Sequence, residues 1–176
     1  MTVLVVYESM YGSTQAIAEA IAEGLTPAGP VRVVEVGALA KSPGGRTISQ
    51  DLELLVVGGP THAFGLSRPN TREDAARDAP GGVVVSAGMG LREWLTELKL
   101  PVGGIRFAAF DTKVVRPKLP GSAAKSADKH LRQMGGRSVA DPRSFGVHGK
   151  ADGIPEGELE NAKAWGAALA ALVVHR

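Results

Sequence analysis

The sequence predicts an α/β protein in which helices cover both faces of a parallel β-sheet, a three-layer α/β/α arrangement. Short apolar runs alternate with helix-patterned segments along the chain, and this alternation is typical of a parallel sheet with crossover helices. The run Leu52 to Gly58 is almost continuously apolar, which indicates a strand buried on both faces. Right-handed crossovers then fix the handedness of the fold.

Five segments carry strand patterns: residues 2–7, 31–36, 52–58, 105–110 and 137–147. The last contains Asp141-Pro142, and because proline cannot donate to a sheet ladder, we expect a bulge or break there. Residues 83–86 also have strand composition, but glycines flank them on both sides. We expect them to form a loop over the functional edge of the sheet rather than a strand.

Apolar residues recur at helical spacing in four further segments, near residues 15–25, 91–98, 123–134 and 159–173. Gly135-Gly136 provides a C-terminal stop for the third of these helices. Residues 72–79 are charged and fit either a short exposed helix or a loop.

Length and composition limit the possible classes of protein. A chain of 176 residues with 44% hydrophobic residues is most simply one domain, residues 1–176, with a substantial core. The absence of cysteine excludes disulfides, thiol catalysis and iron–sulfur clusters, and we expect no metal site. We find neither a signal-peptide pattern nor an apolar run of bilayer length, so we expect a cytoplasmic location.

Charge is distributed unevenly. Residues 113–137 contain seven Lys or Arg and one acid, a net charge of +6, whereas the whole chain carries +2. Such a stretch is often only a solvated helix face, but it also fits docking of an anionic partner, substrate or membrane surface. We do not expect a nucleic-acid partner, because the segment has neither aromatic residues nor a known binding module.

The most informative segment follows the first strand. Glu8 is followed by Ser9-Met10-Tyr11-Gly12-Ser13-Thr14, and a helix begins directly afterwards. Unpaired N–H groups and the positive dipole end of a helix start attract anions, and the hydroxyls add neutral donors. Since the loop has no Lys or Arg, it would bind a phosphate monoester by hydrogen bonds more than by charge. The alternative is an ordinary capped turn.

Two more loops are expected at the same edge, because ligands of open parallel sheets bind at the carboxyl ends of the strands. Gly58 to Leu66 has glycines, a proline and the ring pair His62 and Phe64, and this loop could lie against a flat ring. Alternatively, Phe64 packs on the protein and His62 is solvated. After the fourth strand, Asp111 could accept a hydrogen bond from a ligand, or it could pair with Lys113 or cap a turn.

Together these three loops resemble those of the flavodoxin family, and the resemblance extends over the whole chain. Ser9 to Thr14 looks like the family's hydroxyl-rich phosphate loop, and Gly59 to Gly65 looks like the loop that flanks the flavin ring. The resemblance implies a five-stranded parallel sheet in the order 2-1-3-4-5 and one non-covalent FMN. The three-glycine dinucleotide fingerprint is missing, which disfavours FAD and NAD.

The resemblance also implies the site residues. The expected cofactor-binding residues are Ser9, Met10, Tyr11, Gly12, Ser13, Thr14, Pro60, Thr61, His62, Ala63, Phe64, Gly65, Asp111, Thr112 and Lys113. None of them is expected to be catalytic, because the chemistry belongs to the flavin. The chain departs from electron-carrying flavodoxins in its basic pI near 9.0 and in having no aromatic residue between Asp111 and Gly121.

The leading hypothesis is therefore an FMN-binding electron-transfer protein with a redox partner protein. Two alternatives stay open: an oxidoreductase acting directly on a quinone or porphyrinogen-type anion, and a flavin-less scaffold of the same fold. A receiver domain is disfavoured because the third strand ends in Gly58-Gly59-Pro60 rather than in aspartate. A serine hydrolase is disfavoured because no serine lies in a nucleophile elbow.

Overall fold

The computed structural model describes residues 2–149 and 152–175. Its elements, in chain order, are β1 (Thr2–Tyr7), α1 (Ser13–Leu25), η1 (Thr26–Ala28), β2 (Val31–Glu35), α2 (Val36–Lys41), β3 (Leu52–Pro60), α3 (Pro69–Asp78), η2 (Pro80–Gly82), α4 (Leu91–Glu97), β4 (Arg106–Val114), α5 (Ala123–Gln133), β5 (Arg137–Ser138), β6 (Arg143–Val147) and α6 (Glu158–Val174).

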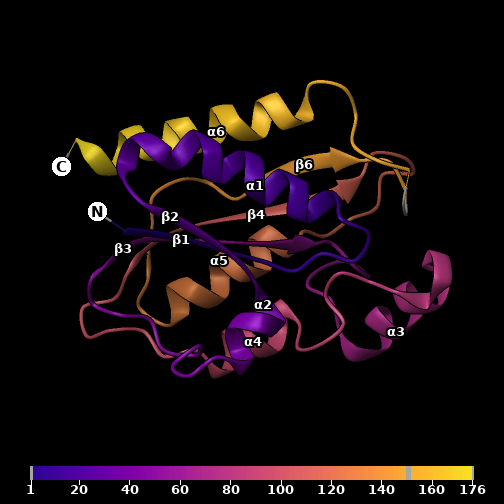
Figure 1. The fold of residues 1–176 in the computed structure, drawn as a ribbon, viewed down its shortest axis with the longest axis horizontal. Helices are drawn as coiled ribbons and strands as arrows, with labels where there is room; N and C mark the ends of the chain where they lie inside the picture. Colours follow the sequence, from indigo (N-terminus) through magenta and orange to yellow (C-terminus); the bar gives the residue numbers. More distant parts are fainter. Residues whose placement is uncertain (1, 150–151, 176) are drawn as a thin grey trace.

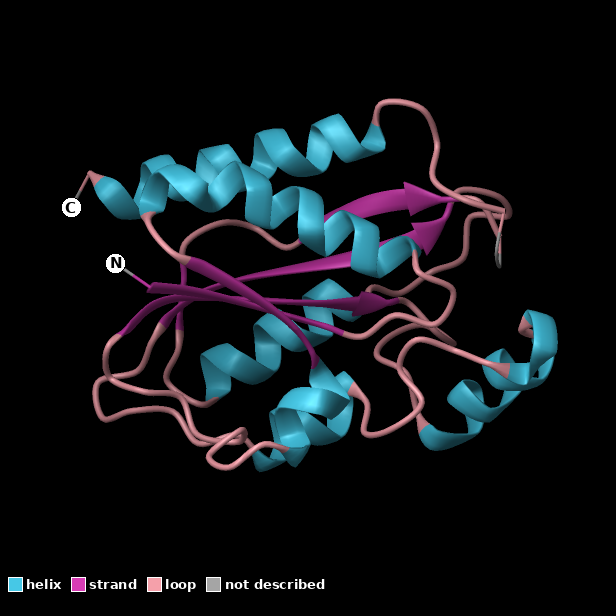
Figure 2. Ribbon diagram, in the orientation of Figure 1, coloured by secondary structure: helices cyan, strands magenta, loops and turns pink. Residues whose placement is uncertain are grey.

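The strands form one parallel sheet in the order β2-β1-β3-β4-β5, with β6 also paired to β4. The α/β class and the strand order 2-1-3-4-5 are thus confirmed. Helices α1 and α6 cover one face of the sheet, and α2, α4 and α5 cover the other (Figures 1 and 2). Helix α3 lies outside these two layers, at the end of the molecule to which the strands point (Figure 2).

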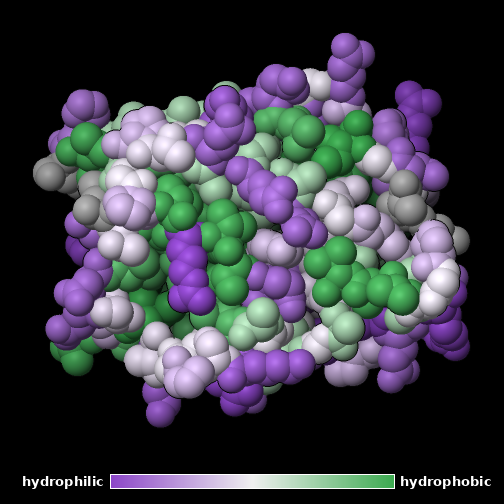
Figure 3. Space-filling view, in the orientation of Figure 1, coloured by the Kyte–Doolittle hydropathy of each residue, from purple (hydrophilic) through white to green (hydrophobic). Residues whose placement is uncertain are grey.

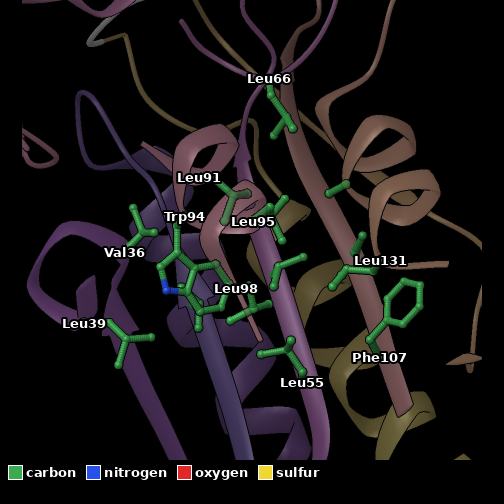
Figure 4. Packing of buried hydrophobic residues seen from close by; sticks show 14 of the residues in the cluster. Val36, Leu39, Leu55, Leu66, Leu91, Trp94, Leu95, Leu98, Phe107 and Leu131 are labelled. Atoms are coloured by element: carbon green, nitrogen blue, oxygen red, sulfur yellow. The ribbon is translucent and has the colours of Figure 1, made fainter. Parts of the chain in front are cut away.

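Each face of the sheet has its own hydrophobic core. On the α4 and α5 side, Trp94 is fully buried among leucines, and its indole N–H donates to the Gly45 carbonyl at 2.8 Å (Figure 4). On the other side, α1 and α6 approach so closely that a Cβ on Gly166 would lie 2.1 Å from the Ile21 carbonyl oxygen. These two packed layers fix the positions of the strand ends that carry the site.

The edge strand β2 is covered less completely. Its residues are exposed or only partly buried, and Figure 3 shows hydrophobic surface between α1 and α2, where β2 lies. The predicted strand also ends one residue early: Val36 begins helix α2, which the sequence pattern did not predict. The Glu35 carboxylate accepts hydrogen bonds from the Gly37 and Ala38 amides, which starts the helix directly after the strand.

Two expectations about the last strands are settled by pairing. The predicted break at Asp141-Pro142 is confirmed, since β5 and β6 are separate strands that pair with different parts of β4. The predicted end of the fourth strand at Phe110 is wrong. Pairing with β3 extends β4 through Thr112 and pairing with β6 extends it through Val114, so that Asp111 to Lys113 lie in a strand and not in a loop.

The two ambiguous segments are also resolved. Residues 72–79 belong mostly to helix α3, and residues 83–86 form a loop, as expected. In the described part of the chain, no helix is both long and apolar enough to cross a membrane.

Candidate functional site

A narrow cleft of about 100 Å³ lies at the carboxyl edge of the sheet, where β1, β3, β4 and β6 end. Its walls come from the loop before α1, the end of β3, the end of β4 and the end of β6. The lining residues are Ser9, Met10, Tyr11, Ser13, Thr14, Pro60, Thr61, His62, Thr112, Val114, Val147 and His148.

The loop before α1 is folded so that the helix start stays open. Gly12 has φ +98°, a left-handed conformation that favours glycine, and its amide donates to the Ser9 hydroxyl at 3.1 Å. No side chain caps α1, and within the described chain the amides of Ser13 and Thr14 have no acceptor. Free N–H groups at the positive end of a helix are suited to an anion.

The segment after η2 holds this loop from behind. The Val85 amide donates to the Met10 carbonyl at 2.9 Å, and the Ser86 amide donates to the Ser9 carbonyl at 2.8 Å. The Ser9 amide in turn donates to the Ser86 hydroxyl at 2.9 Å. Residues 83–86, which we call the strap, therefore hold the loop through three hydrogen bonds.

Further contacts anchor both ends of the same loop. The Tyr11 hydroxyl donates to the Ala75 carbonyl of α3 at 2.9 Å. The hydroxyls of Thr14 and Thr112 lie 2.8 Å apart and share a hydrogen bond across the cleft. The loop is thus fixed before any ligand enters.

A tight turn forms the next wall. His62 and Gly65 exchange two backbone hydrogen bonds of 2.8 Å, and the two residues between them, Ala63 and Phe64, have φ values of +37° and +77°. Left-handed backbone at two non-glycine residues stores strain of roughly 1–2 kcal/mol each. Gly121 lies behind the turn, and a Cβ there would be 2.0 Å from the Phe64 carbonyl oxygen.

Phe64 does not line the cleft. Its side chain is 64% exposed, so it neither faces the cleft nor packs on the protein as the alternative interpretation held. The strained turn points the ring outwards, which the sequence alone could not indicate.

Two imidazoles lie at the cleft. His62 Nδ1 is 3.1 Å from the Thr71 hydroxyl, and burial together with the Arg72 guanidinium lowers the pKa of His62. His62 is therefore partly buried rather than fully solvated, and its lowered pKa favours the neutral form. His148 also lines the cleft, but the sequence interpretation missed it. It directly follows β6, so the rule that ligands bind at carboxyl strand ends would have found it.

Asp111 has a structural role. Its Oδ2 accepts from the Ser122 hydroxyl at 2.5 Å and from the Ala124 amide at 3.0 Å, so it anchors the start of α5. Its side chain is fully buried and does not line the cleft. The Thr61 hydroxyl similarly accepts from the Ala123 amide at 3.0 Å. In the structure the Asp111 carboxylate therefore supports the first turn of α5, together with the N-cap residue Ser122.

Glu8 lies buried behind the loop. Its Oε1 accepts from the Leu91 amide at 2.6 Å. Burial raises the pKa of Glu8, although hydrogen bonds from Ser67 and Leu91 and the charge of Arg72 partly oppose the shift. Arg72 itself bonds to the Ser67 hydroxyl and to Glu93.

The structure thus brings most of the predicted site residues to the cleft and leaves some outside it. The predicted residues that do not line it are Gly12, Ala63, Phe64, Gly65, Asp111 and Lys113. The lining residues that were not predicted are Val114, Val147 and His148. Val114 and Val147 escaped prediction because their place depends on the β4–β6 pairing.

The basic segment 113–137 is divided between two ends of the sheet. Lys113, Arg116 and Lys118 belong to the end of β4 and the loop after it, beside the cleft. Arg132 forms an ion pair of 2.8 Å with Asp128 in α5. Arg137 pairs in register with Arg106, the first residue of β4, and so lies at the opposite edge of the sheet.

Several solved structures share this fold. A flavodoxin from the domain Archaea has 21% sequence identity and a TM-score of 0.65, with 99% of this chain and 100% of that chain covered. Flavodoxin 1 from Bacillus cereus has 16% identity and a TM-score of 0.65, with coverages of 100% and 99%. Identities this low demonstrate a common fold alone.

The flavodiiron protein from Giardia intestinalis is also similar, with 18% identity and a TM-score of 0.59. The match covers 99% of this chain but only 36% of that one. No curated protein matches the sequence closely enough to count as a relative.

The family assignment comes from the sequence. The family model described as Flavodoxin matches residues 5–165, which include the loop before α1, the turn at His62 and the end of β4. Fold, strand order and sequence pattern agree, and the chain belongs to the flavodoxin family.

Proposed function

We propose that this protein binds FMN non-covalently in the cleft and serves as an electron-transfer protein. The observation that carries the proposal is the open start of α1. The amides of Ser13 and Thr14 have no acceptor within the described residues, and they lie at a cleft edged with hydroxyls. This donor set fits a phosphate group held without a cationic side chain.

The loop is suited to a phosphate monoester in particular. Ser9, Ser13 and Thr14 add hydroxyls to the helix amides, and Thr14 is already oriented by Thr112. The closed part of the cleft is small, so it fits the phosphate end of the cofactor, and the flavin ring would lie at the open mouth.

At that mouth, Thr61, His62, Val114, Val147 and His148 would line the ring. When bound, the flavin supplies the capacity to accept and release electrons, and the protein tunes it. The two valines would exclude water from the edge of the ring. Because the pKa of His62 is lowered, its neutral form is favoured, and no second positive charge then lies beside Arg72. Tyr11 lines the cleft at the loop before α1, where its hydroxyl is bonded to the Ala75 carbonyl, and aliphatic side chains and imidazoles would take the place of stacked rings at the mouth.

The charge around the mouth favours an anionic redox partner. None of the segments 9–15, 61–68, 112–122 and 143–149 contains Asp or Glu. Asp111, which precedes the third segment, is buried. They carry Arg68, Lys113, Arg116, Lys118 and Arg143. A cationic rim of this kind would steer an acidic redox protein towards the flavin.

Titration of FMN into the flavin-free protein tests the proposal. Saturable quenching of FMN fluorescence at one equivalent, together with a perturbed flavin absorption spectrum, supports it. Folded protein that does not bind FMN contradicts it, and the flavin-less scaffold then becomes the better account.

A second candidate is an oxidoreductase that acts directly on an anionic quinone or porphyrinogen-type molecule. It is favoured by a cavity of about 310 Å³ beside the cleft, which Lys113 and Lys118 line. Steady turnover of such a substrate by the FMN-loaded protein with a reductant would separate this function from passive electron carriage.

A further inference from the structure

A second hollow lies beside the cofactor cleft, between the loop after β4 and strand β6. It encloses about 310 Å³, which is at the small end of the range for ligand sites. We call it the β6 groove, and its lining residues are Lys113, Val114, Val115, Lys118, Leu119, Ser144, Phe145 and Gly146. Val114 lines both the groove and the cleft, so occupants of the two would be neighbours.

The groove has an apolar wall that the protein leaves exposed. Val114 and Val115 are each 38% exposed, and Leu119 is 62% exposed, although all three are aliphatic. Clustered exposed aliphatic side chains at a concave surface mark an interaction site more often than scattered ones do. An apolar ligand body would remove them from water.

The floor of the groove is firm and flat. It is formed by residues 144–146 of β6, which pair in register with β4. The Phe145 ring is fully buried and packs edge-on against Phe110 and Trp165. Gly146 lets the Val115 side chain pack directly on this strand, since a Cβ on Gly146 would lie 2.6 Å from Val115 Cγ1. The ring of a ligand would therefore lie against the valine side chains that cover the strand.

The rim of the groove is positively charged. Lys113 and Lys118 both line it, and neither has an ion-pair partner in the part of the chain that the structure describes. The neighbouring acid Glu158 is already engaged, because its Oε2 accepts from the Gly146 amide at 2.6 Å. Two unpaired ammonium groups beside an apolar wall complement an apolar ligand that carries a carboxylate.

We propose that the β6 groove binds small aromatic carboxylates, with the ring against Val114, Val115 and Leu119 and the carboxylate at Lys113 and Lys118. Binding itself is independent of the flavin. Electron exchange between the bound carboxylate and a flavin in the neighbouring cleft, by contrast, rests on the proposed function. The alternative occupant, an acidic segment of a partner protein, would use the lysines without needing the ring site.

The matched probes 2-naphthoate and 2-naphthamide test the proposal on the flavin-free, full-length protein. They share ring and size and differ in charge. In amide NMR spectra, we expect 2-naphthoate to shift the signals of residues 113–119 and 144–146 saturably. We expect 2-naphthamide to bind about five-fold or more weakly, the usual weight of an exposed charge pair. Equal binding of both probes, or no binding of 2-naphthoate, would overturn the proposal.

Single substitutions test whether Lys113 and Lys118 hold the carboxylate of the probe. Lys113→Met and Lys118→Met should each weaken 2-naphthoate binding about five-fold and leave 2-naphthamide unchanged. Lys129→Met, an exposed α5 position that does not line the groove, is the matched control and should change neither. Equal affinities in all three variants would contradict the assignment of the carboxylate to the groove lysines.

Competition with FMN separates this proposal from the proposed function. If both are correct, FMN binds without displacing 2-naphthoate, and the two ligands shift different sets of signals. Displacement of 2-naphthoate by FMN would place the probe in the cleft and overturn the groove proposal. Binding of 2-naphthoate without any FMN binding would leave the groove intact and reject the flavin.

Discussion

The loop before α1 and the turn at His62 lie at the same edge of the sheet, but they are built in opposite ways. The loop is buried at its ends and partly buried in between; its backbone is bonded to the strap, and the Thr14 hydroxyl is bonded to Thr112. The turn is closed by two bonds of its own, has left-handed backbone at two non-glycine residues and exposes Phe64 to solvent.

This difference indicates that the two ends of a bound cofactor would meet binding surfaces with different degrees of preorganisation. The phosphate end meets a preorganised cradle that loses little entropy when a ligand binds. The ring end meets a strained turn that is closed by the two His62–Gly65 hydrogen bonds and packs closely against Gly121. The affinity for FMN should therefore depend mainly on the loop before α1, and the redox potential of the bound flavin mainly on the turn at His62. Four predictions test this division.

The largest effect is expected at Gly12. Gly12→Asp introduces a carboxylate into the phosphate loop, and charge repulsion should weaken FMN binding at least about 100-fold, which corresponds to roughly 2.8 kcal/mol. Gly12→Asn is the matched control, because asparagine has the same shape without the charge and tolerates positive φ. Similar FMN affinities of the two variants would argue against a phosphate at this loop.

The next effect concerns the strap. Ser86→Ala removes the acceptor of the buried Ser9 amide and should lower the free energy of unfolding by about 1–3 kcal/mol. FMN affinity should fall as well, since the loop loses its support. Chemical denaturation measures the first effect. Ser49→Ala, at an exposed position, should change little; an equal loss in both variants would mean that the strap does not organise the loop.

A smaller effect is expected at the turn. Phe64 has φ +77° and an exposed ring, so Phe64→Gly should be more stable than Phe64→Ala by about 1 kcal/mol, because only glycine adopts this backbone without strain. Thermal unfolding of the pair measures the difference. If alanine is the more stable, the turn does not store the strain described here.

The smallest effect is the pH dependence from His62. Because burial and Arg72 lower its pKa in the folded protein, the unfolded chain binds more protons below the usual histidine pKa. The contribution of His62 to stability is thus complete above about pH 6.5 and is lost as the pH falls through the folded pKa. His62→Gln should flatten the stability profile below that pH.

The strands could be predicted because each has a local signature, and their order was implied by the resemblance to the flavodoxin family. Leu52 to Gly58 is apolar enough to identify a buried strand, and Asp141-Pro142 marks a break whatever surrounds it. The end of β4 could not be predicted in the same way. Its extension to Val114 depends on pairing with β6, more than 30 residues later in the chain, as the register of Phe110 with Arg143 illustrates.

The same distinction applies to the site. Ser9, Ser13 and Thr14 were found because a hydroxyl-rich loop before a helix is a contiguous pattern. The strap was expected as a loop over this edge, but its hydrogen bonds to Ser9 and Met10 depend on tertiary structure, and His148 could have been found from its place directly after a strand. Phe64 was expected beside a ligand ring, and the structure places its exposed side chain outside the lining of the cleft, in a turn with two positive φ values that no sequence pattern indicates.

The most direct test of the central claim is a paired titration of the flavin-free protein with FMN and with riboflavin, which lacks only the phosphate. If the loop before α1 is the phosphate anchor, FMN should bind about 100-fold or more tightly than riboflavin, and Gly12→Asp should abolish most of that difference. Equal affinities for the two flavins in the wild-type protein would contradict the assignment of this loop.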